Sequence, residues 1–153
     1  MGRWSLFTSL ALLFACSANR DFIASTDRND ISEVVENAKS YLGTRYKYAG
    51  NSRKGLDCSG LVALVYKDAG IALPRNTTDQ SKEGRTINQS SMRPGDLIFF
   101  KRKGKVFHVA IASRIHKDQI WMIHSSTSKG VIEQELSSNS YWMPKLFRIQ
   151  RVL

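Results

Sequence analysis

The sequence predicts an α+β fold, with N-terminal helices packed on a C-terminal antiparallel β-sheet. In residues 31–42 and 61–69, apolar side chains recur at intervals of three and four, which is typical of helices. After Arg93-Pro94-Gly95, a turn signal, the pattern changes to short runs rich in β-branched and aromatic residues. Successive strands with short links favour antiparallel pairing, because a parallel pair needs a long crossover.

The predicted elements have recognisable ends. Asp30 or Ser32 can cap the first helix, and Gly43 ends it. The second helix begins near Asp57-Cys58-Ser59, where Asp and Ser are favourable N-cap residues, and Gly70 ends it. The strands are predicted at residues 96–101, 107–115, 119–126, 130–136 and 146–152.

Residues 1–15 are predicted to be an export signal. Arg3 precedes an apolar run, 6–15, that is too short to span a bilayer; a buried first helix is the alternative. The run ends in Leu13-Phe14-Ala15-Cys16, which resembles a bacterial lipoprotein signal that is cleaved before Cys16 and leaves a lipid on it. Cleavage nearby without a lipid is also open. Residues 16–30 are then a polar tether, and residues 31–153 are the folded domain.

The predicted location is outside the cytoplasm. Ser17 resembles the residue that leaves lipoproteins in the outer membrane of Gram-negative bacteria, on its periplasmic face; a soluble periplasmic protein is the alternative. The formal net charge of +10 indicates an anionic partner. An export signal argues against nucleic acid, so cell-wall carboxylates and anionic lipid surfaces fit better. A solvated basic surface without a partner is the simplest alternative.

The chain has two cysteines, Cys16 and Cys58. If Cys16 carries a lipid, Cys58 is an unpaired thiol in an oxidising compartment, where cysteines usually form pairs. A Cys16–Cys58 disulfide and an inert buried thiol are the alternatives. The start of a helix would stabilise the Cys58 thiolate and lower the pKa of the thiol. Gly60 would leave room for a substrate to approach.

A reactive thiol needs a base, and three histidines are available. His116 lies in a predicted three-residue turn, 116–118, between two strands. With that turn, the sequence numbers of two residues that face each other across the strands add up to 234. His108 and His124 are then diagonal neighbours on one face, whereas a turn of even length would place them on opposite faces. The small side chains of Ala110 and Ala112 on this face would leave space for the helix that carries the cysteine.

Six motifs stand in an order and spacing that resemble the NlpC family of papain-like cysteine peptidases of bacterial cell walls. They are Tyr46-x-Tyr48-Ala-Gly, Asp57-Cys58-Ser59-Gly60-Leu61, Leu73-Pro74-Arg75, Pro94-Gly95-Asp96-Leu97-Ile98-Phe99-Phe100, His108-Val109-Ala110-Ile111 and Ile123-His124-Ser125-Ser126-Thr127. The resemblance covers about residues 31–152, and residues 124–142 look especially like NlpC lipoproteins.

The resemblance implies a role for each matching residue. Cys58 matches the nucleophile, His108 the general base, and His124 the third residue that orients the base. Tyr46 matches a tyrosine whose hydroxyl lies near the oxyanion; Tyr48 competes for this role, and a merely packed aromatic residue is the alternative.

Further positions match the border of the site. Asp57 and Ser59 are expected to cap the helix or to contact substrate. Arg75 is expected to meet a substrate carboxylate, with a solvated surface arginine as the alternative. Asp96 matches a structural turn position. No cofactor and no metal are expected, because the cysteine and histidines lack zinc-like spacing.

The function implied by the resemblance is hydrolysis of an amide bond in peptidoglycan stem peptides. The bond is either D-glutamyl–diaminopimelate or the D-alanyl–diaminopimelate cross-link. Two other functions stay open: a non-catalytic wall-binding or regulatory lipoprotein, and a thiol-dependent lipid acyltransferase. Loss of a catalytic residue would favour the first of these, and an apolar groove beside Cys58 would favour the second.

Overall fold

The computed structural model describes residues 31–153. The predicted export signal, the predicted tether and the predicted lipidation site Cys16 lie outside these residues. Residues 31–40 are helical, and Gly43 ends the following turn with φ of 83°. The remaining elements are β1 (Asn51–Ser52), β2 (Gly55–Leu56), α2 (Cys58–Asp68), α3 (Thr77–Gln80), β3 (Arg85–Ile87), β4 (Leu97–Arg102), β5 (Lys105–His116), β6 (Gln119–Ser126), β7 (Gly130–Glu135) and β8 (Leu146–Arg151), with short 3₁₀ helices at Gln89–Ser91 and Met143–Lys145. No helix in this described part is long and apolar enough to cross a membrane.

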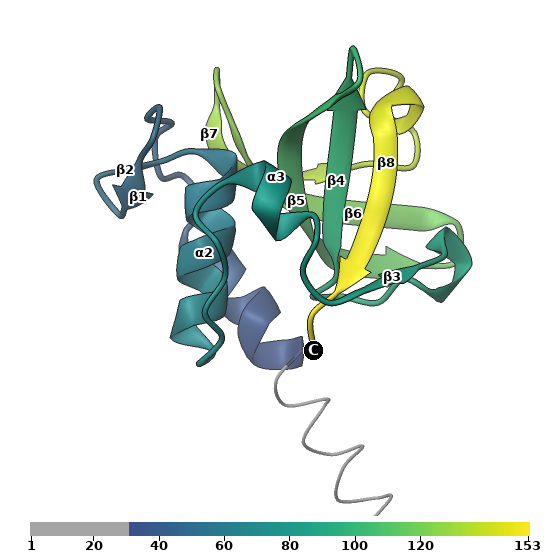
Figure 1. Ribbon diagram of the computed structural model, residues 1–153, viewed down its shortest axis with the longest axis horizontal. Helices are drawn as coiled ribbons and strands as arrows, with labels where there is room; N and C mark the ends of the chain where they lie inside the picture. The colour runs from purple at the N-terminus through teal and green to yellow at the C-terminus, as the bar shows by residue number, and fades with distance from the viewer. Residues whose placement is uncertain (1–30) are drawn as a thin grey trace, which may run out of the picture.

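The fold class is confirmed: helices from the first half of the chain pack on an antiparallel sheet from the second half (Figure 1). The sheet has six strands in the order β3-β8-β4-β5-β6-β7. All five predicted strands are present, with ends within two residues of the prediction. The sequence pattern missed β3, because this strand has only three residues and two of them are exposed.

Both faces of the sheet are buried. One face packs against the helices through Val109 and Ile111 of β5 together with Leu61 and Val65 of α2. The other face forms a second apolar cluster that contains Ile98, Phe100, Ala110, Ala112, Met122 and Leu136. The sheet curves around this second cluster: in Figure 1, β4 and β8 stand nearly upright, while β6 crosses behind them.

The helix that carries Cys58 does not lie over Ala110 and Ala112, and that prediction was wrong. Alternation was read correctly for residues 109–112, but the helix packs on the Val109 face, and Phe107 and Ile115 pack against the other cluster. The sequence pattern suggested that one face of β5 is apolar and that the other leaves space for a helix. Because the sheet is curved, the alanine face is instead buried on the concave side of the sheet. The small alanine side chains fit this interior.

A buried ion pair joins the last strand to the turn before β4. Arg151 binds Asp96 through Nε and Nη2, each at 2.8 Å, and Nη2 also donates to the carbonyl of Ser91. Asp96 additionally accepts from the backbone N–H of Arg93 at 2.6 Å. The two side chains are 7% and 3% exposed. The turn residue Asp96 is thus a structural anchor, and the pair closes the sheet beside the helices.

Replacing Asp96 with alanine should lower the free energy of unfolding by about 3–5 kcal/mol, because Arg151 would keep a buried charge without a partner. Urea unfolding of both proteins measures the difference. The matched control is Glu36→Gln, which removes the exposed Glu36–Lys39 pair and should change stability little. Equal losses in the two variants would contradict the structural role of Asp96.

Candidate active site

Cys58 is the first residue of α2, as predicted. The helix begins there because Asp57 adopts an extended backbone and its side chain accepts a hydrogen bond from the Gly60 N–H at 2.7 Å. Cys58 is a free, half-buried thiol that packs against the helix-side apolar cluster. Cys16, its alternative disulfide partner, lies outside the described residues.

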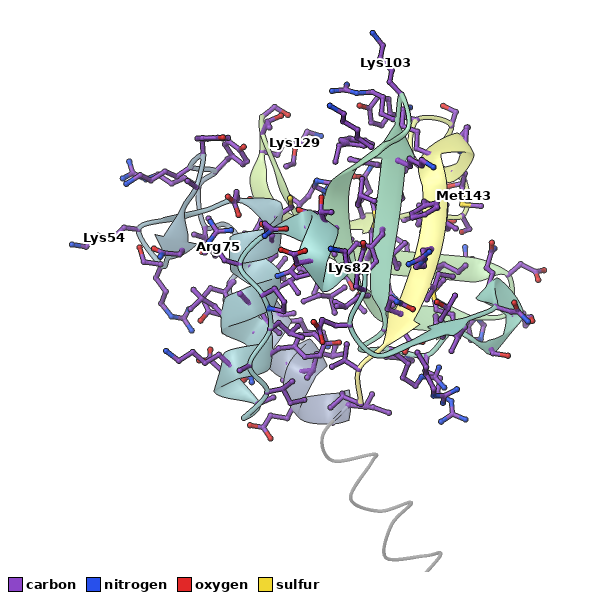
Figure 2. The ribbon with its side chains drawn as sticks, in the orientation of Figure 1. Lys54, Arg75, Lys82, Lys103, Lys129 and Met143 are labelled. Atoms are coloured by element: carbon purple, nitrogen blue, oxygen red, sulfur yellow. The ribbon has the colours of Figure 1, made fainter. Side chains whose placement is uncertain are left out.

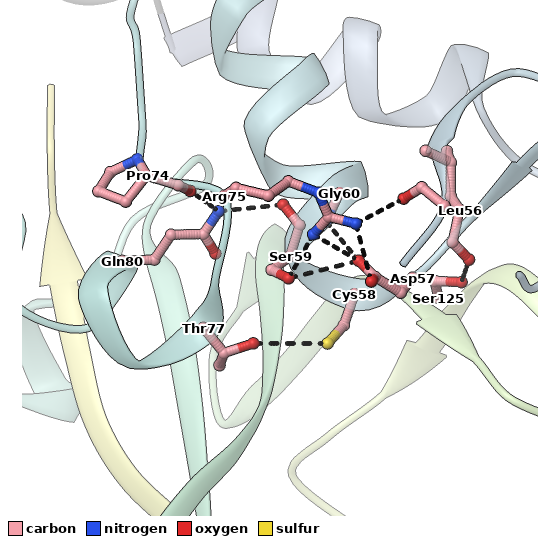
Figure 3. Close-up of polar contacts among 11 residues, drawn as sticks. Leu56, Asp57, Cys58, Ser59, Gly60, Pro74, Arg75, Thr77, Gln80 and Ser125 are labelled. Atoms are coloured by element: carbon pink, nitrogen blue, oxygen red, sulfur yellow. Dashed lines mark hydrogen bonds and ion pairs between the residues drawn. The ribbon is translucent and has the colours of Figure 1, made fainter. Parts of the chain in front are cut away.

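Arg75 is tied to the start of α2 (Figure 3). Its guanidinium binds both carboxylate oxygens of Asp57, at 2.8 and 3.0 Å, the Ser59 hydroxyl at 2.9 Å and the Gly50 carbonyl at 2.9 Å. Both Nη atoms are therefore engaged by the start of α2 and the Gly50 loop, although the Arg75 side chain remains 40% exposed. Substrate contact by Arg75 stays a prediction. In the structure, Arg75 forms a bidentate ion pair with Asp57, the residue that caps α2.

Gly60 leaves room for the Gly50 loop and for Arg75 rather than for a substrate. A Cβ atom at this position would lie 2.1 Å from the carbonyl oxygen of Gly50 and 3.1 Å from an Nη atom of Arg75. A side chain would therefore push the loop that contains Gly50 away from α2. The glycine is needed for close packing of backbone on backbone.

Thr77 was not identified from the sequence. Its Oγ1 atom lies 3.8 Å from Sγ of Cys58 (Figure 3). Nearby, the side-chain amide of Gln80 donates to the carbonyls of Ser59 and Pro74, which ties the short helix α3 to α2. No sequence signal links Thr77 to Cys58, because their contact depends on how α3 packs.

The turn between β5 and β6 is shorter than predicted. The prediction placed Ile115 opposite Gln119 across a three-residue turn, whereas His116 faces Gln119 and the turn consists of Lys117-Asp118. By itself, this change would move the two site histidines to opposite faces, because one step along a strand reverses the direction of the side chain.

A β-bulge restores the predicted register. Ser113 is an extra residue in β5 without a partner in β6, and beyond it Ile111 faces Ile123, as predicted. His108 and His124 therefore meet. Their Nε2 and Nδ1 atoms, respectively, are 2.9 Å apart, and the rings lie edge to face.

Two further side chains hold the histidine pair. Trp142 stacks on His108 with 4.6 Å between the ring centroids and an angle of 25°, and it meets His124 edge to face. Oε1 of Gln134 lies 3.1 Å from Nε2 of His124. The aromatic pair Tyr141-Trp142 belonged to the recognised pattern, but neither Trp142 nor Gln134 was predicted to contact a histidine.

The cleft opens where β5 and β6 separate. Their pairing ends at Ile111 and Ile123; the preceding part of β5 pairs only with β4, and the following part of β6 only with β7. A cleft of about 480 Å³ lies there. Its walls are formed by Tyr46, Cys58, Arg102, Phe107, His108, Ser125, Ser126, Thr127, Tyr141 and Trp142. Cys58 and His108 thus face one space, although they come from opposite sides of the sheet.

Tyr46 and Tyr48 lie in different surroundings. Tyr46 lines the cleft, whereas Tyr48 is 85% exposed. Burial, followed by the nearby Cys58 and Asp57, raises the pKa of Tyr46, so its hydroxyl keeps its proton and can donate a hydrogen bond. This geometry favours Tyr46 for the oxyanion role.

The thiol and the histidines are neutral in the resting site. Burial raises the pKa of the Cys58 thiol, and hydrogen bonds with Thr77 and with the backbone of Val109 only partly oppose this. Burial, with a smaller effect of His124, lowers the pKa of His108 to about 3, and burial also lowers the pKa of His124. The expectation that the helix start gives Cys58 a lowered pKa was wrong, because desolvation is the larger effect.

Burial of His108 as a neutral ring predicts a pH-dependent stability. Its pKa is about 3 when folded and about 6.5 when unfolded, so between these values the unfolded chain binds the extra proton. The free energy of unfolding should therefore fall as the pH falls, by about 2 kcal/mol from pH 6.5 to pH 5. Urea unfolding at several pH values measures this slope, which should be smaller in His108→Gln. An equal slope in both proteins would contradict the buried neutral ring.

Within residues 31–153 no cluster of three or more His, Cys, Asp or Glu side chains could hold a metal ion. A thiol, a bare imidazole nitrogen and a phenolic hydroxyl around one space can support nucleophilic acyl transfer.

Comparison with known proteins places this geometry in a family. The model of the NlpC/P60 family matches residues 43–151. The probable endopeptidase NlpC of Escherichia coli K12 is 34% identical, over 98% of this chain and 99% of its own length. The murein DD-endopeptidase MepS/murein LD-carboxypeptidase of the same strain is 34% identical, over 89% of this chain and 71% of its own. The γ-DL-glutamyl hydrolase of Bacillus subtilis is 38% identical, over 78% of this chain but 29% of its own length.

Solved structures show the same fold. An NlpC/P60 family protein from Bacillus cereus superposes with a TM-score of 0.73 at 33% identity, covering 80% of this chain and 40% of its own. RipD of Mycobacterium tuberculosis has a TM-score of 0.65 at 25% identity, covering 81% of this chain and 98% of its own. RipD is described as a non-catalytic NlpC/P60 domain protein adapted to peptidoglycan binding.

Proposed function

This chain belongs to the NlpC/P60 family of cysteine hydrolases, and we propose that Cys58 hydrolyses an amide bond in the stem peptide of peptidoglycan. The observation that supports this most strongly is the shared cleft of Cys58, His108 and Tyr46, with His124 hydrogen-bonded to His108. In this proposal Cys58 is the nucleophile and His108 the base, His124 orients the base, and Tyr46 donates to the oxyanion.

In the proposed reaction, Sγ of Cys58 attacks the amide carbon while His108 takes the thiol proton. The Tyr46 hydroxyl and the Cys58 N–H stabilise the oxyanion. His108 then gives its proton to the leaving amine, and a thioester remains on Cys58. Water, activated by His108, hydrolyses the thioester and frees the thiol. His124 keeps the His108 ring in position throughout.

Proton transfer accompanies attack in this scheme. The raised pKa of Cys58 and the lowered pKa of His108 favour a neutral thiol and a neutral imidazole in the absence of substrate. The His108 ring is therefore unprotonated at neutral pH, and in this scheme it takes the thiol proton as the bond from Sγ to the carbonyl carbon forms.

A basic surface beside the cleft fits an anionic substrate. Arg102 lines the cleft, stacks its guanidinium 4.9 Å from the Phe107 ring centroid, and has no carboxylate partner among residues 31–153. Lys103 and Lys129 point outward from the neighbouring β4–β5 and β6–β7 turns (Figure 2). A free carboxylate lies beside each candidate bond, on D-glutamate for the first and on diaminopimelate for the cross-link, and Arg102 can bind either one.

The bond is D-glutamyl–diaminopimelate or the D-alanyl–diaminopimelate cross-link. The names of the relatives point both ways, to a glutamyl hydrolase and to a DD-endopeptidase. Incubating the purified protein with peptidoglycan and determining the masses of the released peptides separates the two. The first cut releases fragments that begin with diaminopimelate, whereas the second converts cross-linked dimers into monomers. Unchanged peptidoglycan would contradict the proposal.

The two other functions have distinct expectations. RipD shows that a similar fold can bind peptidoglycan without catalysis; here, binding of peptidoglycan without any cleavage would identify that function. A lipid acyltransferase would transfer a labelled acyl chain and leave peptidoglycan intact. Half of the ten residues that line the cleft are polar or histidine and four of the others are aromatic, so the cleft is not the uniformly apolar groove that would favour an acyl chain.

We also propose that Cys16 carries a lipid that holds the protein on the periplasmic face of the outer membrane. The motif Leu13-Phe14-Ala15-Cys16 and the following Ser17 support this placement. Detergent partitioning of the wild type and of Cys16→Ala tests it. The variant should move to the soluble fraction, and full retention of the variant in the membrane would exclude the anchor.

A further inference from the structure

Gln134 lies next to the proposed catalytic histidines but has no part in the reaction described above. It belongs to β7, where it faces Met122 of β6, while His124 faces Ile132. Gln134 and His124 are therefore diagonal neighbours on one face of the sheet. Their closest polar atoms, Oε1 of Gln134 and Nε2 of His124, are 3.1 Å apart.

The side chains of Gln134, His124 and His108 form a row of two hydrogen bonds, and the Gln134 amide determines the direction of each. The amide oxygen can only accept, so Nε2 of His124 carries the hydrogen. A neutral imidazole has one N–H, so Nδ1 of His124 is bare and accepts. Nε2 of His108, 2.9 Å away, is then the donor. The remaining nitrogen of His108, Nδ1, is consequently bare.

We propose that Gln134 is a positioning residue: by accepting a hydrogen bond from His124, it fixes the tautomers of both histidines and leaves Nδ1 of His108 free to take the proton of Cys58. The inference rests on the proposed function, because it assigns His108 as the base. Turning the amide by 180° would place its NH₂ group on His124 and reverse both bonds. Nδ1 of His108 would then carry the hydrogen and could not accept another.

A neutral acceptor also suits this position. The histidines share a buried site with Trp142, where an imidazolium ion is disfavoured. A carboxylate at position 134 would fix the same tautomers but would attract a proton to the pair. Glutamine thus orients the base without charging it, and this contrast between amide and carboxylate supplies the test.

Gln134→Met removes the acceptor at similar volume, and Gln134→Glu retains it. We expect Gln134→Met to lower kcat by about 10- to 100-fold with KM little changed. Gln134→Glu should retain kcat near the wild-type value at pH 8, with the acid limb of its pH profile moved to higher pH. The control is Glu133→Gln, a neighbouring change on β7 whose side chain binds Ser113; it should leave kcat unchanged.

Nitrogen-15 NMR of histidine-labelled protein at pH 7 tests the tautomers without reference to activity. We expect a bare Nδ1 and a protonated Nε2 on both His108 and His124 in the wild type and in Gln134→Glu, and mixed tautomers in Gln134→Met. A protonated Nδ1 on His108 in the wild type, or unchanged tautomers in Gln134→Met, would overturn the inference. If the tautomers are as expected but the protein cleaves no peptide, the proposed function fails instead.

Discussion

Replacing Cys58 with alanine is expected to lower kcat/KM for a stem-peptide substrate by at least about 10³-fold, since the proposed acyl intermediate forms on its Sγ atom. The loss should appear in kcat, because Arg102, Tyr46 and Trp142, which shape the rest of the cleft, remain in place. Release of peptides from a defined cross-linked or linear muropeptide, followed by mass, measures both constants.

The fold should tolerate this change. Cys58 is the first residue of α2, its helix cap is provided by Asp57, and alanine favours helices. Urea unfolding should therefore give a free energy close to that of the wild type. Loss of activity together with loss of folding would not identify a nucleophile, and an active Cys58→Ala variant would rule out Cys58 as the nucleophile.

Replacing His108 with alanine is expected to lower kcat by about 10²- to 10⁴-fold, which is the usual contribution of a positioned base. The matched control is His116→Ala, which removes the exposed histidine beside the β5–β6 turn and should leave kcat unchanged. Equal activity of the two variants would remove His108 from the mechanism.

The pH dependence of wild-type activity provides a second test of His108 as the base. Only the neutral ring can take the thiol proton, and its pKa is about 3, so it stays neutral as the pH falls through 6 and 5. We expect kcat/KM for a stem-peptide substrate to show no acid limb near 6.5, the ordinary pKa of histidine. An acid limb at about 6.5 would mean that His108 is not a buried, neutral base.

Local sequence signals predicted the position of Cys58 well. Asp57 before an apolar helical pattern places Cys58 at a helix start, and the structure has the helix begin there. Helices followed by strands likewise gave the correct fold class. These features depend on residues close together in the chain, which is why the pattern was sufficient.

The pairing of the histidines was predicted correctly through two errors that cancel. The turn has two residues rather than three, and the bulge at Ser113 adds the missing step. A bulge in the middle of a strand has no clear sequence signal, since Ser113 differs little from its neighbours in strand propensity. The prediction that His108 and His124 share a face was therefore right, but the turn length on which it was based was wrong.

The surroundings of the site could not be predicted, because they come from distant segments. Trp142 reaches His108 from beyond β7, Thr77 reaches Cys58 from α3, and Arg75 binds the cap of α2. The pKa of Cys58 is another example. The helix start is visible in the sequence, whereas the burial that outweighs it depends on the packed sheet.

The most direct measurement of the central claim is residual activity as a function of the alkylated fraction of Cys58. The purified protein is treated with iodoacetamide at mildly alkaline pH for increasing times, modification of Cys58 is quantified by peptide mass, and cleavage of a defined muropeptide is assayed on each sample. If Cys58 is the nucleophile, activity falls in proportion to modification and reaches zero when Cys58 is fully alkylated, and bound substrate slows the reaction. Cleavage that continues with Cys58 fully alkylated would contradict this account.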